Sequence, residues 1–228
     1  ERTEEVVRQK EEVERQSRKV VELYKNVTDS IRYAKRLQDS ILPPERRIRE
    51  LLPESFVYYR PKDIVSGDFY WVDRVDGRVA FAAVDCTGHG VPGAFMSLIG
   101  HNGLNQAIRE RGAGRPSEVL KVLNKLAFEA LHKDREQFLV RDGMDMALCN
   151  YDPSRRVLEY AGANSPLYIV RGTEVLRFSP DKRPIGSFEL DGQDFTDHRI
   201  LLEQGDMVYL FSDGYADQFG GPEGKKFK

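Results

Sequence analysis

The sequence predicts an α+β fold in which antiparallel sheets are flanked by helices, with a long helix in front of them. Three features support this prediction. Residues 1–42 follow a helical pattern that contains no Gly or Pro. Short apolar runs separated by turn residues come next, and two helical segments follow them. Further short runs complete the chain, and strands on both sides of a helical pair favour antiparallel sheets covered by those helices.

Residues 1–42 are interpreted as a helical signalling linker that forms a parallel, dimeric coiled coil. Apolar residues recur every seven positions along it, at Val6, Val13, Val20, Val27, Ala34 and Ile41. The second core position of the heptad mixes polar and apolar residues, so we expect a weak seam. A single amphipathic helix lying on the following domain stays open as the alternative.

The globular domain is predicted to begin after a short connector. Pro43 and Pro44 end the helix, because proline lacks the N–H and restricts the residue before it. Residues 43–54 form the connector, and residues 55–228 form the domain. Its first strands are predicted at Phe56–Tyr59, Phe69–Val75 and Arg78–Val84, and Asp76-Gly77 between the last two is typical of a hairpin turn.

The rest of the domain is predicted as two helices and six short strands. One helix begins near Pro92, and the other begins after Pro116, where Ser117 suits the N-cap position. The strands are expected at Met146–Tyr151, Val157–Ala161, Leu167–Val170, Val175–Phe178, His198–Leu202 and Met207–Phe211.

The bulk properties exclude several classes of protein. A formal net charge of -2 gives no reason to expect nucleic acid or an anionic membrane surface as a partner. No apolar stretch approaches the roughly 20 residues that span a bilayer, and the charged N-terminus has no signal-peptide core. Cys86 and Cys149 do not make a disulfide framework. We therefore predict a cytoplasmic protein.

Three aspartates stand next to predicted strands and close to glycines. Asp85 ends one apolar run, Asp68 precedes another, and Asp213 follows the last one. A rigid strand can aim a carboxylate, and a nearby glycine lets a ligand approach the backbone. Each aspartate taken alone suits an ordinary turn, but three in one domain favour a shared metal site.

The residue types favour Mg²⁺ or Mn²⁺ over zinc. Hard cations prefer carboxylates, carbonyl groups and water, and the chain has no His/Cys cluster at zinc spacing. Two such ions about 3.5–4 Å apart can activate a water for phosphoryl displacement. We expect Asp85 to bridge the ions and the Cys86 carbonyl to complete one shell. Asp213 would hold the other ion, and Asp68 would bind an ion or orient its waters.

Six motifs, in order, resemble those of the stage II sporulation protein E-type phosphatases, the bacterial branch of the metal-dependent (PPM, type 2C) serine/threonine phosphatases: Ser66-Gly67-Asp68-Phe69-Tyr70, Asp85-Cys86-Thr87-Gly88-His89-Gly90, Asp142-Gly143-Met144-Asp145-Met146-Ala147, Ala161-Gly162-Ala163-Asn164-Ser165-Pro166-Leu167, Pro184-Ile185-Gly186 and Ser212-Asp213-Gly214. The resemblance implies a β-sandwich flanked by helices, with two Mn²⁺ or Mg²⁺ ions. It implies hydrolysis of phosphoserine or phosphothreonine by a metal-bound hydroxide. The typical substrates of such families are phosphorylated anti-sigma-factor antagonists. The resemblance also supports a signalling role for the first helix.

The sequence departs from this family in one respect. The family carries a further metal-binding aspartate in an Asp-Asp motif near its C-terminal strand, and no such motif occurs before Lys228. We therefore expect one of the two metal sites to be weak. An inactive phosphoprotein-binding or dimerisation module is the alternative function, while a nucleotide-binding domain is disfavoured because the P-loop Gly-Lys-Ser/Thr is missing.

Two further residues are candidates for the site. His89 is a candidate general acid, since its ordinary pKa lies near neutrality, and the alternative is a role in the turn. Asp145 would hold a further ion or a water, and the alternative is a hydrogen-bonded loop residue.

Gly100 and Gly103 fall inside the first domain helix, where glycine weakens a helix. We predict that the N-terminal helix regulates the metal site by shifting this helix.

Overall fold

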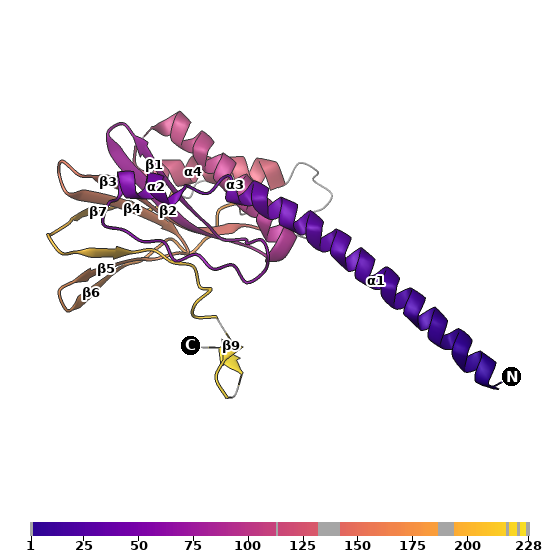
Figure 1. Ribbon diagram of the computed structural model, residues 1–228. Coiled ribbons are helices and arrows are strands. Elements are labelled where there is room, and N and C mark those ends of the chain that lie inside the picture. Colours follow the sequence, from indigo (N-terminus) through magenta and orange to yellow (C-terminus); the bar gives the residue numbers. More distant parts are fainter. Residues whose placement is uncertain are drawn as a thin grey trace.

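Two antiparallel sheets face each other, and a pair of helices covers one outer side (Figure 1). The computed structural model describes residues 2–112, 114–131, 142–186, 194–217, 219–222 and 224–226. The larger sheet has the order β1-β2-β3-β4-β7 and the smaller one the order β6-β5-β8. The large-sheet strands are β1 (Phe69–Val75), β2 (Arg78–Cys86), β3 (Met144–Asp152), β4 (Val157–Ala163) and β7 (His198–Leu201). The others are β5 (Leu167–Arg171), β6 (Glu174–Phe178) and β8 (Met207–Tyr209), with a separate hairpin of β9 (Phe219–Gly220) and β10 (Lys225–Lys226).

The two faces of the large sheet carry different cores, because successive side chains of a strand point to opposite faces. Ala80, Ala82 and Val84 of β2 belong to the cluster that packs under the helices α3 (Gly90–Arg111) and α4 (Pro116–Leu131). Side chains on the other face of the sheet, such as Cys149 of β3 and Tyr160 of β4, belong to the cluster that fills the space between the sheets. Asp85 follows Val84 on β2, so it lies on this second face, which meets the small sheet.

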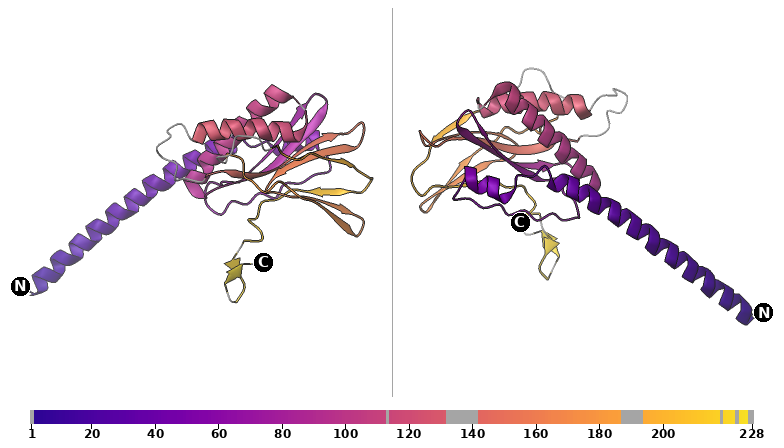
Figure 2. Two further views of the ribbon diagram at one scale, coloured as in Figure 1. Left: turned by 180° about the vertical axis from the view of Figure 1, so that it is seen from behind. Right: turned by 45° about the horizontal axis from the view of Figure 1, so that its top comes forward.

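Helices cover the sandwich unevenly (Figure 2). The α3–α4 pair lies on the outer face of the large sheet. The short helix α2 (Glu45–Leu51) lies in the predicted connector and packs Ile48 and Leu51 against Val72 and Val79 on the other face of the same sheet. The connector is therefore part of the packed domain.

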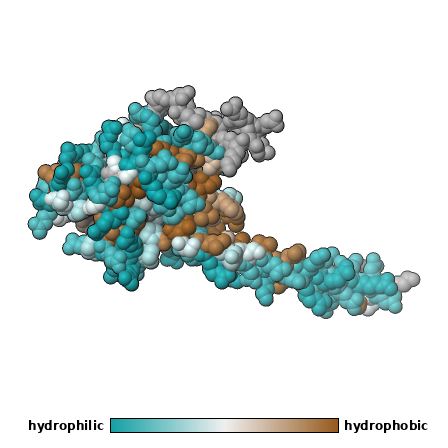
Figure 3. Space-filling view, turned by 90° about the horizontal axis from the view of Figure 1, so that it is seen from above, coloured by the Kyte–Doolittle hydropathy of each residue, from teal (hydrophilic) through white to brown (hydrophobic). Residues whose placement is uncertain are grey.

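The long helix α1 (Arg2–Asp39) projects away from the domain, and only its last turns meet it (Figures 1 and 2). Brown apolar side chains interrupt its hydrophilic surface (Figure 3). The valines of the heptad pattern are exposed, at 59% for Val6, 63% for Val13, 64% for Val20 and 58% for Val27. By contrast, Gln38 near the end of the helix is 2% exposed.

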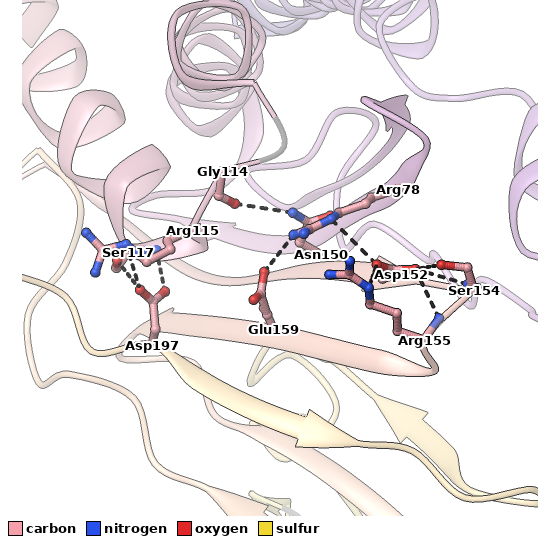
Figure 4. A network of polar contacts seen from close by, with 10 residues as sticks. All are labelled: Arg78, Gly114, Arg115, Ser117, Asn150, Asp152, Ser154, Arg155, Glu159 and Asp197. Carbon is pink, nitrogen blue, oxygen red and sulfur yellow. Dashed lines mark hydrogen bonds and ion pairs between the residues drawn. The ribbon is translucent and has the colours of Figure 1, made fainter.

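A polar network connects the strands of the large sheet at the end that is far from Asp85 (Figure 4). Arg78 at the start of β2 donates to Glu159 of β4 at 2.9 Å and lies 4.0 Å from Asp152 of β3. The Asn150 amide donates to the Gly114 carbonyl at 3.2 Å. These contacts fix the register of three neighbouring strands at the end of the sheet away from the aspartates.

The N-terminus of α4 is capped from a distant loop (Figure 4). The Asp197 carboxylate accepts hydrogen bonds from the Ser117 N–H at 2.9 Å and from the Ser117 hydroxyl at 2.5 Å. A carboxylate at a helix N-terminus satisfies donors that have no partner within the helix. The N-cap prediction for Ser117 is therefore wrong, since Ser117 is the second residue of the helix and Asp197 provides the cap.

The predicted α+β class and the antiparallel sandwich are confirmed, and one strand is wrong. No strand forms at Phe56–Tyr59, which belong to an extended segment outside both sheets. Phe56 and Tyr58 are 75% and 76% exposed, so the aromatic residues that suggested a strand have no sheet face to cover. Within the residues described, no helix combines the length and the apolar character needed to cross a membrane.

Candidate metal centre

Strand register places three aspartates in one row at an end of the large sheet. Asp85 of β2 pairs directly with Asp145 of β3. Phe69 pairs with Val84, so Asp68, which precedes β1, comes next to Asp85. Like charges opposite each other destabilise a sheet. The row is therefore unfavourable in the absence of a cation.

The small sheet brings a fourth aspartate to this row. Asp213 follows β8, and the preceding Ser212 hydroxyl donates to the Asp68 carboxylate at 2.7 Å. An open pocket of about 350 Å³ results, lined by Asp68, Asp85, Cys86, Thr87, Gly88, His89, Asp145 and Asp213. The structure thus brings together every residue that the sequence suggested for the site.

Two carboxyl groups of the pocket, Asp85 and Asp145, have raised pKa values. Burial, followed by the charges of Asp68 and Asp213, raises the pKa of Asp85 to about 7, although the Asp213 backbone N–H acts in the opposite direction. Burial also raises the pKa of Asp145, while a hydrogen bond from Asn164 lowers it. A bound cation would relieve the repulsion that these shifts report.

Cys86 can take part through its carbonyl oxygen. Burial raises the pKa of its thiol, with a further contribution from Asp68, and the side chain is 3% exposed on the helix side of the sheet. A neutral buried thiol is a poor metal ligand. The carbonyl faces Gly67, where a Cβ atom would lie 2.9 Å from it.

The donor set fits hard cations that keep water ligands. Among the side chains that the structure describes, no group of three or more His, Cys, Asp or Glu residues is placed to hold one ion by itself. Carboxylates spread around an open pocket, together with a carbonyl group, suit Mg²⁺ or Mn²⁺, which complete their shells with water. Zinc would require a tighter nitrogen or sulfur set.

Three glycine backbones meet behind the pocket. A Cβ atom on Gly93 of α3 would lie 2.5 Å from the Gly88 carbonyl oxygen and 2.9 Å from the Gly67 Cα. Separations below 3.0 Å from backbone atoms leave no room for a side chain. The loop of Asp68, the loop after Asp85 and the first turn of α3 are therefore held in direct contact.

Three residues in or near the site make hydrogen bonds that the sequence did not predict. The Asn164 amide donates to Asp145 at 2.8 Å, from a backbone with φ of +57°. The His89 Nδ1 lies 2.8 Å from the Asp63 carboxylate. Gln38 of α1 reaches Ser66, two residues before Asp68. Asn164 and His89 each lie within one of the six motifs, whereas nothing in the sequence pointed to Gln38.

The raised pKa of Asp85 predicts that the metal-free protein loses stability as the pH rises. The ordinary pKa is 3.8 and the folded value is about 7, so Asp85 is protonated in both states only well below pH 3.8. The loss of stability grows as the pH rises from there and is complete above pH 7. With EDTA present, we expect the melting temperature of wild type to fall by several degrees over this range. Asp85→Asn should remove part of the fall, as measured by thermal unfolding. A wild-type melting temperature that rises between pH 4 and pH 7 by more than that of Asp85→Asn would contradict this.

The chain matches the family described as Stage II sporulation protein E (SpoIIE) over residues 75–228. Phosphoserine phosphatase RsbU of Bacillus subtilis (strain 168) is 29% identical to it over 162 residues. That match takes in 69% of the chain and 44% of RsbU, so the chain spans less than half the length of this curated relative.

Solved structures give the same result. The SiaA-PP2C domain of Pseudomonas aeruginosa matches with a TM-score of 0.78 and 34% identity, over 89% of this chain and 78% of that one. The PP2C phosphatase domain of SpoIIE from Bacillus subtilis, with a fragment of its regulatory domain, gives a TM-score of 0.55 at 21% identity, over 68% and 43%. The second likeness, at this identity, concerns the fold alone.

Proposed function

Because the chain belongs to the stage II sporulation protein E family, we propose that it is a Mn²⁺- or Mg²⁺-dependent phosphatase that hydrolyses phosphoserine or phosphothreonine. One observation carries the proposal. Asp68, Asp85, Asp145 and Asp213 converge on one open pocket, and burial together with the charges of Asp68 and Asp213 raises the pKa of Asp85 to about 7. A site of this kind is built to attract cations, and strongly shifted carboxyl groups in a cleft mark functional sites.

Each residue has a defined task in this proposal. Asp85 lies in the middle of the row and would bind both ions, and Asp68 and Asp213 would each bind one of them. The Cys86 carbonyl would add a further oxygen ligand. Asp145, held by Asn164 at 2.8 Å, binds a further ion or orients a water. The bound ions would supply a water of lowered pKa as the nucleophile and would stabilise the oxyanions of the phosphoryl group.

We propose that the substrate is a phosphorylated regulatory protein of the anti-sigma-factor antagonist type. The pocket is open to solvent, as a phosphoserine on a folded protein requires. Exposed Arg60 and Lys62 lie on the segment that leads to the pocket, where cations can meet the phosphate. RsbU carries the name of a phosphoserine phosphatase.

The alternative is a module that binds phosphoproteins without hydrolysing them. It is favoured by the finding that, in the described part of the chain, no three acidic, His or Cys side chains could hold a metal ion together. Phosphate release from a phosphoserine peptide with Mn²⁺, alongside binding of the same peptide by fluorescence anisotropy, separates the two. Turnover that EDTA removes supports the phosphatase, whereas binding without turnover supports the module.

We propose that α1 regulates the site through Gln38. The amide nitrogen of Gln38 donates to the Ser66 carbonyl at 2.6 Å and to the Ser97 hydroxyl at 2.8 Å. Its oxygen accepts from the Ser66 N–H at 3.0 Å, and the Ser66 hydroxyl in turn accepts from the Asp68 N–H at 3.0 Å. A shift of α1 therefore acts on the loop of Asp68 and on α3 at once.

Gln38→Leu is expected to lower both stability and metal affinity. The change leaves the N–H and C=O of Ser66 without their partner, and an unsatisfied buried group costs about 1–3 kcal/mol. Calorimetric titration with Mn²⁺ should show at least about tenfold weaker binding, since 1.4 kcal/mol is a factor of ten. Gln9→Leu makes the same change on an exposed turn of α1 and serves as the control. Unchanged Mn²⁺ affinity in Gln38→Leu would exclude this route.

We propose that two copies of the chain pair through the valine stripe of α1. The stripe is apolar, exposed and seven-spaced, and a lone helix in water gains stability by covering it. Val13→Asn with Val20→Asn should convert a dimer into a monomer in sedimentation at micromolar concentration. Glu11→Asn with Arg18→Asn changes the opposite side of the same turns and should leave the dimer intact. A wild-type chain that sediments as a monomer would contradict the proposal.

A further inference from the structure

His89 and Asp63 form a pair at the mouth of the pocket. His89 is the N-cap residue of α3 and lines the pocket, and its Nδ1 lies 2.8 Å from the Asp63 Oδ2. Asp63 lies in the extended segment before β1, 26 residues away along the chain. The next residue approaches the same carboxylate, since a Cβ on Gly90 would be 3.6 Å from the Asp63 Oδ2. The carboxylate is thus seated against the first turn of α3.

This contact decides how the imidazole can act. A carboxylate accepts a hydrogen bond from Nδ1–H, which fixes the ring orientation and assigns the proton on that nitrogen. The ring nitrogen Nε2 is then the one left to serve a ligand in the pocket.

We infer that Asp63 is a positioning residue that holds His89 as the general acid of the reaction. The inference rests on the proposed phosphatase function. As the bond between phosphorus and the serine oxygen breaks, His89 Nε2–H gives its proton to that oxygen, and serine leaves as the neutral alcohol. The attacking water forms the new bond to phosphorus and loses one proton to solvent. The ring regains a proton from solvent, so that protons balance over the cycle.

The alternative role of this pair is structural. The side chains of His89 and Asp63 are 74% and 42% exposed, and an exposed ion pair contributes only about 0–1 kcal/mol to stability. A merely structural pair would affect all substrates equally. A general acid matters only where the leaving group needs a proton, as a serine alkoxide does and a p-nitrophenolate does not.

The test compares these two leaving groups in the full chain with Mn²⁺. His89→Gln should lower kcat for a phosphoserine peptide by about 10²-fold, the lower range for general acid catalysis. Asp63→Asn keeps the side-chain shape but removes the charge, and should lower it by about tenfold, with KM unchanged. Both variants should hydrolyse p-nitrophenyl phosphate within about twofold of wild type, which also shows that they fold. Glu54→Gln removes a carboxylate from the same segment and should leave both rates unchanged.

Equal losses on both substrates, or no loss in Asp63→Asn, would overturn the inference and leave the phosphatase intact. Absence of turnover by wild type on either substrate would instead overturn the proposed function.

The orientation of the His89 ring by Asp63 can also be measured without enzyme activity. In ¹⁵N spectra of the metal-free chain, the ring signal that disappears in His89→Gln should show a proton on Nδ1, and Asp63→Asn should change it. A ring that is the same in wild type and Asp63→Asn would also overturn the inference.

Discussion

Asp85→Asn is expected to lower kcat for a phosphoserine peptide by about 10³-fold, because a metal contributes several kcal/mol to such a reaction and each 1.4 kcal/mol is a factor of ten. Asn keeps the size of the side chain but lacks the second charged oxygen that a bridging ligand needs. Asp85 lies between Asp68 and Asp145 in the row, so its loss affects both ions. Initial rates at saturating Mn²⁺, together with calorimetric titration of the ion, measure the effect.

Asp73→Asn is the matched control for this change. Asp73 lies on β1 of the same sheet, and its carboxylate makes an ion pair with Arg47 at 2.8 Å. The side chains are 48% and 43% exposed, and such surface pairs contribute little. Activity of Asp73→Asn should therefore match that of wild type. An Asp85→Asn variant that keeps a wild-type rate would show that the pocket is not the catalytic centre.

Gly93→Ala is expected to be the most damaging small change outside the carboxylates. The added Cβ would lie 2.5 Å from the Gly88 oxygen and 2.9 Å from the Gly67 Cα, so that backbone must move. Overpacking of this kind costs about 1–3 kcal/mol, which exceeds the roughly 1 kcal/mol that Ala gains over Gly in a helix. The moving loops carry Asp68 and Asp85, and a misplacement of about 1 Å can cost about 10²-fold in rate. Urea unfolding and kcat with Mn²⁺ measure the two effects.

Gly103→Ala provides the control on the same helix. Its Cβ would meet only the end of the Leu123 side chain, at 2.8 Å, which can move aside. We expect little loss of stability and no loss of activity. Similar behaviour of Gly93→Ala and Gly103→Ala would show that the glycine contact does not hold the site.

Much of the site was predictable because it depends on local patterns. Alternation of apolar residues predicted the strands, and Asp68, Asp85 and Asp213 marked the positions where strands begin or end. Asp145 followed from its motif. The sheet register was not predictable, since a shift of one residue would turn Asp145 to the other face and away from Asp85.

Contacts between distant segments could not be predicted. Gln38 meets Ser66 across 28 residues, and Asp63 meets His89 across 26. Neither Gln38 nor Asp63 differs from its neighbours in composition or spacing, because a polar residue on a charged helix and an acidic residue in a loop are ordinary. The wrong strand at Phe56–Tyr59 has a related cause, since a strand needs a neighbour and the local sequence does not supply one.

The initial rate of phosphate release from a phosphoserine peptide, measured against Mn²⁺ concentration, decides whether the chain is a metal-dependent phosphatase. We expect a rate that rises and saturates with Mn²⁺, falls to background with EDTA and is lost in Asp85→Asn. A rate that is independent of the ion, or a chain that binds Mn²⁺ at the pocket and releases no phosphate at any concentration, would contradict this expectation.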